Sequence, residues 1–132
     1  MKEQRKSLKN IQDQIIKEYR VTIDENSRCR SRMHVHVKQR RICKWKQVSS
    51  VKATFELLHE IGHCENNNST MRRCEAEYYA TEWALRKCRE YGIDVPQYLV
   101  DKYQDYVYRE LDRGLRRGGV CYPSKEEMKL VK

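Results

Sequence analysis

The chain has 132 residues, enough for one domain that buries roughly two-thirds of the surface its unfolded form exposes. Only 39% of the residues are hydrophobic and 36% are charged, so the composition excludes a large apolar core. Lysine and arginine outnumber aspartate and glutamate by 28 to 19, and the net charge of +9 favours nucleic acid or another acidic partner. Because the basic residues are scattered, a well-solvated surface is the alternative explanation.

The first twenty residues carry many charges and no apolar stretch, which predicts neither a secretion signal nor a membrane span. We therefore expect a cytoplasmic protein, in which thiols stay reduced. The six cysteines form no CxxC pair, and their spacings match no four-ligand zinc knuckle. Most of them are expected to be small buried groups or free thiols.

Two regions of secondary structure are predicted in the first third of the chain. Apolar residues at helical spacing predict an amphipathic helix over 3–19, and DENS at 24–27 has the composition of a turn. Further on, RMHVHVKQRRICKWK at 32–46 alternates and is rich in β-branched and aromatic residues, which indicates one or two strands that could pair as a hairpin. His34 and His36 would point to the same side of such a strand.

Two longer helices follow. Ser49 or Ser50 can cap the first of them, and a run of asparagines ends it. Ser69 can then cap a third helix over about 70–91. Gly92 is placed to close this helix, because glycine adopts the left-handed conformation that commonly follows a helix end.

A last helix and a tail are predicted after residue 95. Pro96 is suited to the start of a helix, whose apolar stripe and tyrosines we expect to pack in the core. The segment 119–132 has neither an apolar stripe nor a cap. We therefore predict one domain over residues 1–118, followed by a flexible tail.

The second predicted helix contains HEIGH, an H-E-x-x-H motif. His59 and His63 are four residues apart, so their rings project from one face and can reach one zinc ion at about 2.0–2.1 Å. Glu60 lies about 100° around the helix, beside the ion, where a general base can take a proton from water. Gly62 lets another element approach closely. The alternative is that two histidines share a helix face by chance.

A catalytic zinc ion needs a third protein ligand and an open position. Glu75 and Glu77 compete for this role from nearly opposite faces of the third helix. The face of Glu77 continues with small residues, which favours tight packing against Gly62, whereas the face of Glu75 is bulkier and more polar. We therefore prefer Glu77 as the ligand. Thr81, one turn later, is placed to hydrogen-bond a ligand.

Two cysteines near the motif are alternative ligands, since thiolates bind zinc well. Cys64 lies about 140° from His59 around the helix, which disfavours it. Cys74 lies off the face of Glu77 and is disfavoured for that reason.

These motifs resemble the signature of a known family. HEIGH followed by EYYATEWA, which starts at Glu77, is similar to the HExxH…E-x-x-A-[N/D/T]-x-[F/W]-A pattern of the ImmA/IrrE metallopeptidases, gluzincin-type enzymes common in phages, mobile elements and bacteria. The similarity covers about residues 51–92 and can be extended to YQDYVYRELDRGLRRGG at 103–119. The chain departs from the pattern at Thr81, where many members carry Asn or Asp. It also has no room for the separate helix-turn-helix domain that the family often carries.

The resemblance implies a zinc-dependent endopeptidase that cleaves a cytoplasmic protein, often a transcriptional repressor, in a bacterium or a phage-infected host cell. Zn²⁺ would be held by His59, His63 and Glu77, and Glu60 would be the general base.

The oxyanion formed during hydrolysis needs a second stabilising donor besides the metal. Four residues remain open candidates for this role: Tyr78, Tyr79, His34 and His36. In zinc peptidases of this general kind an edge strand before the metal helix aligns the substrate, and MHVHVK at 33–38 could be that strand.

The expected fold class is α+β: a mostly helical, zincin-like single domain with a small antiparallel sheet preceding the HExxH helix. The competing function is a basic phage regulatory module that binds nucleic acid or a protein partner and keeps a structural or vestigial zinc site. Glu60 favours the peptidase, because a purely structural site has no need of a base. For either function we expect at most weak, non-specific nucleic-acid binding and no membrane association.

Overall fold

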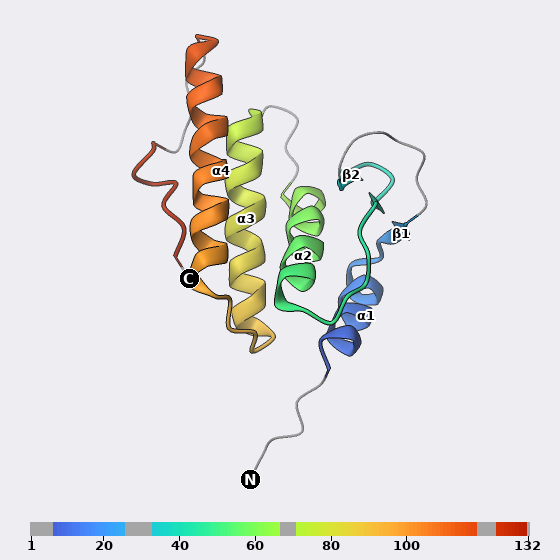
Figure 1. Ribbon diagram of the computed structural model, residues 1–132. Helices are drawn as coiled ribbons and strands as arrows, with labels where there is room; N and C mark the ends of the chain where they lie inside the picture. The colour runs from blue at the N-terminus through green and yellow to red at the C-terminus, as the bar shows by residue number, and fades with distance from the viewer. Residues whose placement is uncertain (1–6, 26–32, 67–70, 119–123, 132) are drawn as a thin grey trace.

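The computed structural model describes residues 7–25, 33–66, 71–118 and 124–131 (Figure 1). Within these ranges the chain forms α1 (Leu8–Tyr19), β1 (Thr22–Asp24), β2 (His34–His36), β3 (Arg41–Cys43), α2 (Val51–Glu65), α3 (Arg73–Glu90) and α4 (Gln97–Arg116). The described part of the chain is therefore α+β and mostly helical, as predicted.

Helix α2 lies at the centre of the arrangement. It packs against α3 on one side, and α3 packs in turn against α4. On its other side α2 contacts α1 and strand β2 (Figure 1). Four of its apolar side chains are fully buried: Phe55, Leu57, Leu58 and Ile61. None of the helices in the described ranges is long and apolar enough to cross a membrane.

The sheet is mixed, whereas a purely antiparallel sheet was predicted. Strands β2 and β3 form the expected antiparallel hairpin, but β1 adds a parallel neighbour on the other side of β3. The sequence analysis missed β1 because it is only three residues long and borders a predicted turn. Its backbone finds partners far along the chain: Thr22 N–H donates to Arg40 at 2.9 Å, and the Asp24 carbonyl accepts from Lys44 at 2.9 Å.

The helix starts agree with the sequence in two cases and differ in two. Ser50 caps α2 as predicted, with Oγ accepting from the Ala53 N–H at 3.1 Å, and Pro96 precedes α4. Helix α1 begins at Leu8 rather than at residue 3, and residues 1–6 lie outside the described ranges. Helix α3 begins at Arg73, and the predicted cap, at position 69, also lies outside them.

Gly92 closes α3 as predicted. Its φ of +74° is in the left-handed region, where a side chain would be strained. The N–H of Gly92 donates to Arg89 at 3.0 Å, and the N–H of Ile93 donates to Cys88 at 2.8 Å. This pair of bonds is the Schellman pattern, which satisfies carbonyls at the end of the helix.

The segment predicted to be a loose tail is docked where the structure describes it. In 124–131, Met128 and Leu130 are buried, at 0% and 7% relative exposure. The Gln104 side chain on α4 donates to the Met128 carbonyl at 3.1 Å and accepts from the Leu130 N–H at 2.6 Å. Two apolar side chains, two residues apart, suffice to dock this short segment, which forms a turn at 125–128, without any helical stripe.

Candidate metal centre

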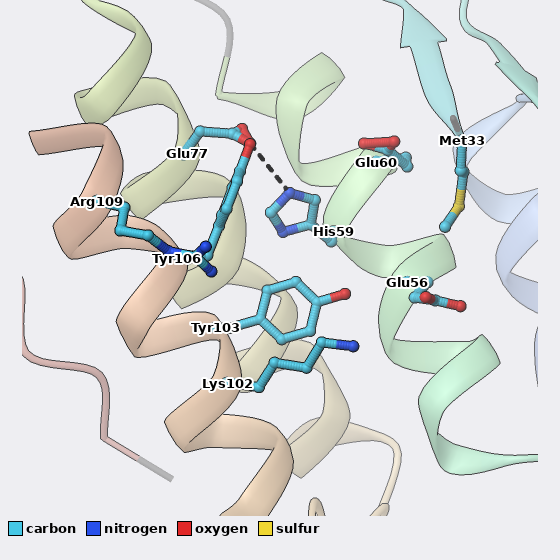
Figure 2. A pocket seen from close by; sticks show the side chains of 9 residues that line it. All are labelled: Met33, Glu56, His59, Glu60, Glu77, Lys102, Tyr103, Tyr106 and Arg109. Atoms are coloured by element: carbon cyan, nitrogen blue, oxygen red, sulfur yellow. Dashed lines mark ion pairs between the residues drawn. The ribbon is translucent and has the colours of Figure 1, made fainter. Parts of the chain in front are cut away.

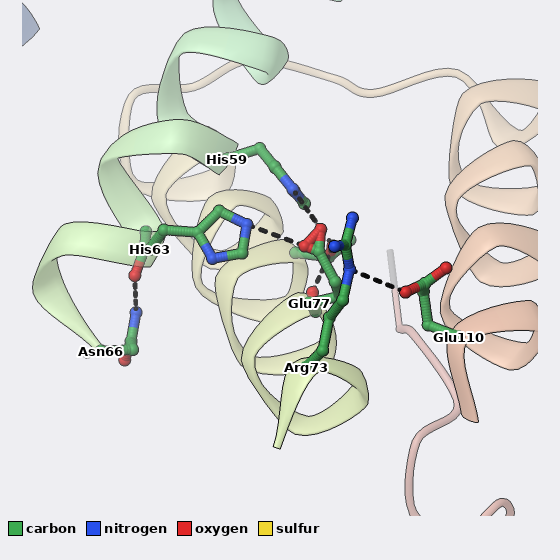
Figure 3. Close-up of polar contacts among 8 residues, drawn as sticks. His59, His63, Asn66, Arg73, Glu77 and Glu110 are labelled. Carbon is green, nitrogen blue, oxygen red and sulfur yellow. Dashed lines mark hydrogen bonds and ion pairs between the residues drawn. The ribbon is translucent and has the colours of Figure 1, made fainter. Parts of the chain in front are cut away.

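Helix α2 presents two histidine rings from one buried face. The rings of His59 and His63 have centroids 4.9 Å apart and lie nearly perpendicular to each other. His59 is buried and His63 is partly exposed. The i, i+4 spacing therefore produces the predicted juxtaposition (Figure 3).

Helix α3 brings the carboxylate of Glu77 to both rings. One oxygen lies 3.5 Å from Nε2 of His59 and the other lies 2.9 Å from Nε2 of His63. Ligands that bind zinc tetrahedrally at about 2.0–2.2 Å are about 3.3–3.5 Å from one another. The distance of 3.5 Å matches this spacing, and two imidazole nitrogens with a carboxylate are a donor set that zinc binds. We call the side chains of His59, His63 and Glu77 the metal group.

Thr81 determines which nitrogen of His59 carries the proton. Its hydroxyl donates to the main-chain carbonyl of Glu77 at 2.7 Å and lies 3.1 Å from Nδ1 of His59. Because a hydroxyl has one proton, Thr81 accepts from Nδ1–H, and this leaves the Nε2 lone pair facing Glu77. A lone pair and a carboxylate at 3.5 Å call for a cation between them, either a proton or a metal ion. The hydrogen bond predicted for Thr81 is therefore present.

The close approach of α3 depends on Gly62. A Cβ atom at this position would lie 2.8 Å from the carbonyl oxygen and 3.0 Å from Cα of Ala80, both backbone atoms of α3. The facing residues Ala80, Thr81 and Ala84 are small and fully buried. The tight packing predicted from the small face of α3 is therefore present, and it sets the distance between Glu77 and the two rings.

The electrostatics of the group follow from burial and pairing. Burial raises the pKa of Glu77, but hydrogen bonds from His59 and His63 and the charges of both rings outweigh it and hold the pKa far below the usual value. Burial lowers the pKa of His63, but its hydrogen bond to Glu77 and the charges of Glu77 and Glu60 raise it on balance. The lowered pKa of Glu77 and the raised pKa of His63 both favour a positive charge between α2 and α3.

Glu60 lies beside this group without pairing with it. One carboxylate oxygen lies within 4.8 Å of a ring nitrogen of His59 and of His63. Glu60 has 8% relative exposure. Burial raises its pKa, and the negative charge of Glu77 adds to the shift, whereas His59, His63 and His34 oppose it. A carboxylate with a raised pKa next to a metal group is suited to accept a proton.

Two cavities adjoin Glu60. The first, of about 470 Å³, is lined by Met33, Glu56, His59, Glu60, Glu77, Lys102, Tyr103, Tyr106 and Arg109 (Figure 2). The second, of about 350 Å³, shares Met33, Glu60, Glu77 and Tyr106 with it and adds His34, Val35, Val37, His63, Arg73 and Ala76. Both cavities open onto Glu60 and Glu77, so a molecule bound in either one would contact the candidate base.

Two tyrosines of α4 that were predicted to pack in the core also line the first cavity. Tyr103 and Tyr106 are three residues apart, and Arg109 follows after another three, so all three face the cavity (Figure 2). The Tyr103 ring lies 5.5 Å from the His59 ring, centroid to centroid. Burial raises the pKa of both tyrosines, so their hydroxyls stay protonated and can donate hydrogen bonds. The spacing of three residues between Tyr103 and Tyr106 was the feature of the sequence from which their common direction could have been predicted.

A buried carboxylate on α4 ties α3 to α4 beside the metal group. Glu110 accepts from Arg73 at 2.9 Å (Figure 3). It also accepts from Arg113 at 3.0 Å. Arg73 also hydrogen-bonds Tyr106, which raises the pKa of the guanidinium and orients the tyrosine. This network was not predicted, because it needs two helices to be placed side by side.

Several predicted candidates lie away from Glu60. Glu75 accepts from the backbone N–H of Arg72 at 3.2 Å and so acts at the start of α3 rather than at the histidines. Tyr78 and Tyr79 contact each other, with ring centroids 5.1 Å apart, and neither lines the two cavities. His34, in contrast, lines the second cavity together with Glu60, and His36 contacts His34.

The two cysteines considered as ligands are not in the group either. Cys74 is buried in a small apolar cluster with Val107, Leu111 and Met128. Cys64 lies on α2 at intermediate exposure, where burial raises the pKa of its thiol. The described donors nearest to one another around α2 are those of His59, Glu60 and His63, with Glu77 paired to both rings.

Comparison of the chain with protein-family models, with curated proteins and with solved structures gives no match. Function is therefore inferred from the geometry of this site, together with the pattern of HEIGH and EYYATEWA in the sequence.

Proposed function

We propose that the protein is a zinc-dependent endopeptidase of the ImmA/IrrE type, which hydrolyses a peptide bond of a protein substrate beside Glu60. One observation carries the proposal: the Glu77 carboxylate lies 3.5 Å from Nε2 of His59 and 2.9 Å from Nε2 of His63. Glu60, with an oxygen within 4.8 Å of a nitrogen of each ring, lines the adjoining cavity of about 470 Å³. A purely structural metal site would not require a buried carboxylate next to the ligands.

The chemistry follows from the positions of these groups. Bound Zn²⁺ would supply a Lewis acid that polarises the scissile carbonyl and lowers the pKa of water toward neutrality. Glu60 would take the proton from the attacking water and give it to the leaving amine nitrogen. Its raised pKa suits the first transfer, because a stronger base accepts the proton from water more readily.

Stabilisation of the oxyanion is assigned to α4. Tyr103 and Tyr106 line the cavity that contains Glu60, and both hydroxyls are protonated donors. These residues replace Tyr78 and Tyr79 as candidates, because the latter two do not line the cavity. His34, which lines the second cavity together with Glu60, remains a candidate.

The substrate is proposed to bind as an extended strand. Strand β2 is at one edge of the sheet and lies beside α2, and Met33 at its start lines the cavity. An extended chain that pairs with this edge would run past Glu60. The motif resemblance favours a cytoplasmic protein, such as a transcriptional repressor, as the substrate.

The test is Glu60→Gln, which keeps the size of the side chain but removes the base. We expect full zinc content and a fall in cleavage of about 10²–10⁴-fold, measured by co-expression with repressor-like proteins encoded near the gene and by gel analysis of the products. Glu65→Gln, on the same helix but paired with Arg40, is the control and should cleave normally. Cleavage by Glu60→Gln at the wild-type rate would disprove the mechanism.

A further inference from the structure

Strand β2 carries two histidines whose rings meet on one side. His34 and His36 alternate with Val35, so both project from the same face. Their Nε2 atoms are 3.3 Å apart, and their ring centroids are 4.9 Å apart. Both side chains are partly exposed. This pair is formed within a single strand and does not depend on the metal group on α2.

The neighbouring strand places a thiol next to this pair. Cys43 on β3 is directly opposite His34 in the antiparallel register, so their side chains lie on the same face. The Cys43 sulfur and a ring nitrogen from each histidine all lie within 4.8 Å of one another. Cys43 is fully buried, whereas the two rings reach toward the surface. The three donors thus lie close together, with the sulfur buried and the two rings partly exposed.

The distance between the two imidazole nitrogens matches that of a zinc site, and the sulfur lies within 4.8 Å of both. Two nitrogens bound tetrahedrally at about 2.0–2.1 Å lie about 3.3 Å apart, and a thiolate bound at about 2.3 Å lies about 3.5 Å from each nitrogen. The observed Nε2–Nε2 distance of 3.3 Å equals the distance expected between two zinc-bound nitrogens. A nitrogen and sulfur donor set selects zinc or another borderline to soft transition metal over magnesium or calcium.

We propose that His34, His36 and Cys43 form a second metal site, which binds Zn²⁺ through two imidazoles and one thiolate. Three protein ligands leave one position for water. The ion would hold β2 in register with β3, since its ligands come from both strands of the hairpin. His34 also lines the second cavity, which Glu60 adjoins, so the metal site would stabilise a wall of the cavity in which a substrate would lie. The proposal does not depend on peptidase activity.

Cobalt(II) distinguishes this site from the one on α2. Only a thiolate ligand gives a sulfur-to-cobalt charge-transfer band, and the group of His59, His63 and Glu77 contains no sulfur. The tag-free full chain is stripped with chelator, reduced, and loaded with Zn²⁺ or Co²⁺. We expect two metal ions per chain and a charge-transfer band in the wild-type protein. Cys43→Ser should lose one ion and the band, whereas His59→Ala should lose one ion and keep the band.

Two further variants control for folding and for other thiols. His36→Asn changes a partly exposed residue and should also lose one ion, with an unchanged circular dichroism spectrum. Cys64→Ser removes the thiol beside His63 and should keep both ions and the band. A wild-type protein without the band, or a band that survives Cys43→Ser or disappears in Cys64→Ser, would overturn the proposal, whereas one ion per chain with a band that Cys43→Ser abolishes would count against the α2 site alone.

Discussion

Two glutamates only two residues apart have different roles on α3. They differ by about 200° in direction around the helix. Glu77 is buried and faces His59 and His63, whereas Glu75 is only partly buried and accepts a bond from the backbone of Arg72. Rotation around the helix, and not residue type, thus decides which of the two carboxylates faces the rings.

This difference predicts opposite effects of the same substitution. Glu77→Gln should lose most of the bound zinc, because a neutral amide oxygen is a poor zinc ligand, and should lose the stability that zinc adds to the native state. Glu75→Gln should keep its zinc and lose at most about 1 kcal/mol of stability at the helix start. Zinc per chain and thermal unfolding with and without zinc provide the measurement. The opposite result would make Glu75 the ligand.

The pair of His63 and Glu77 predicts a pH dependence in the metal-free protein. Burial lowers the pKa of His63, but Glu77 outweighs this effect and raises it above 6.5. A raised pKa stabilises the fold fully below about pH 6.5, and this stability is lost as the pH rises through the folded-state pKa. The pKa of Glu77 is lowered from 4.5, so its contribution is present above that pH and is lost as the pH falls.

We therefore expect the chelated wild-type protein to lose free energy of unfolding as the pH rises above 6.5. Urea titrations over a series of pH values measure this loss. His63→Gln should show a flatter profile over the same range. A wild-type profile as flat as that of the variant would show that the pair does not stabilise the metal-free fold.

At the level of elements, the metal group depends on how closely α2 and α3 pack. Gly62 faces the backbone of Ala80, which cannot rotate away as a side chain could. A methyl group there forces the helices apart and moves Glu77 away from both rings. The contact between two small residues thus links packing to metal binding.

Gly62→Ala should destabilise the protein by about 1–3 kcal/mol through overpacking and should also weaken zinc binding. Gly114→Ala is the control, because Gly114 lies in the last turns of α4, away from the metal group. There alanine should be neutral or stabilise by up to about 1 kcal/mol, with unchanged zinc affinity. Chemical denaturation and competition with a zinc chelator measure the two quantities. Normal zinc affinity in Gly62→Ala would mean that helix spacing does not control the site.

At the level of the whole molecule, the candidate active site is assembled from segments far apart in sequence. Met33 near β2, Glu60 on α2, Glu77 on α3 and Tyr106 on α4 all line the same cavity. The docked segment 124–131 braces α4 through Gln104. The net charge of +9 is likewise a property of the whole chain and bears on its partners.

The charge predicts weak and salt-sensitive binding to duplex DNA. Each neutralised phosphate releases counterions, so the logarithm of affinity should fall with the logarithm of salt concentration by about 0.9 per contact. Fluorescence anisotropy with unrelated duplexes between low and physiological salt measures this slope. We expect no preference among sequences. A salt-resistant complex with one sequence would instead favour the regulatory module.

The features that the sequence determined are local. The i, i+4 spacing of His59 and His63, the Ser50 cap and the Gly92 helix end were all predicted correctly, because helix geometry is set by residues within a turn or two. Glu77 was also preferred correctly over Glu75 as the carboxylate facing the rings, since the small residues on its face mark the packed side of α3.

The tertiary structure alone decided the rest. Strand β1 has too few residues to be recognised and exists because β3, nineteen residues later in the parallel register, pairs with it. Cys43 meets His34 only through the strand register, and Tyr103 and Tyr106 reach Glu60 only because α4 packs beside α3. Such contacts join segments whose relative placement depends on burying apolar surface over the whole chain, and no local spacing encodes that placement.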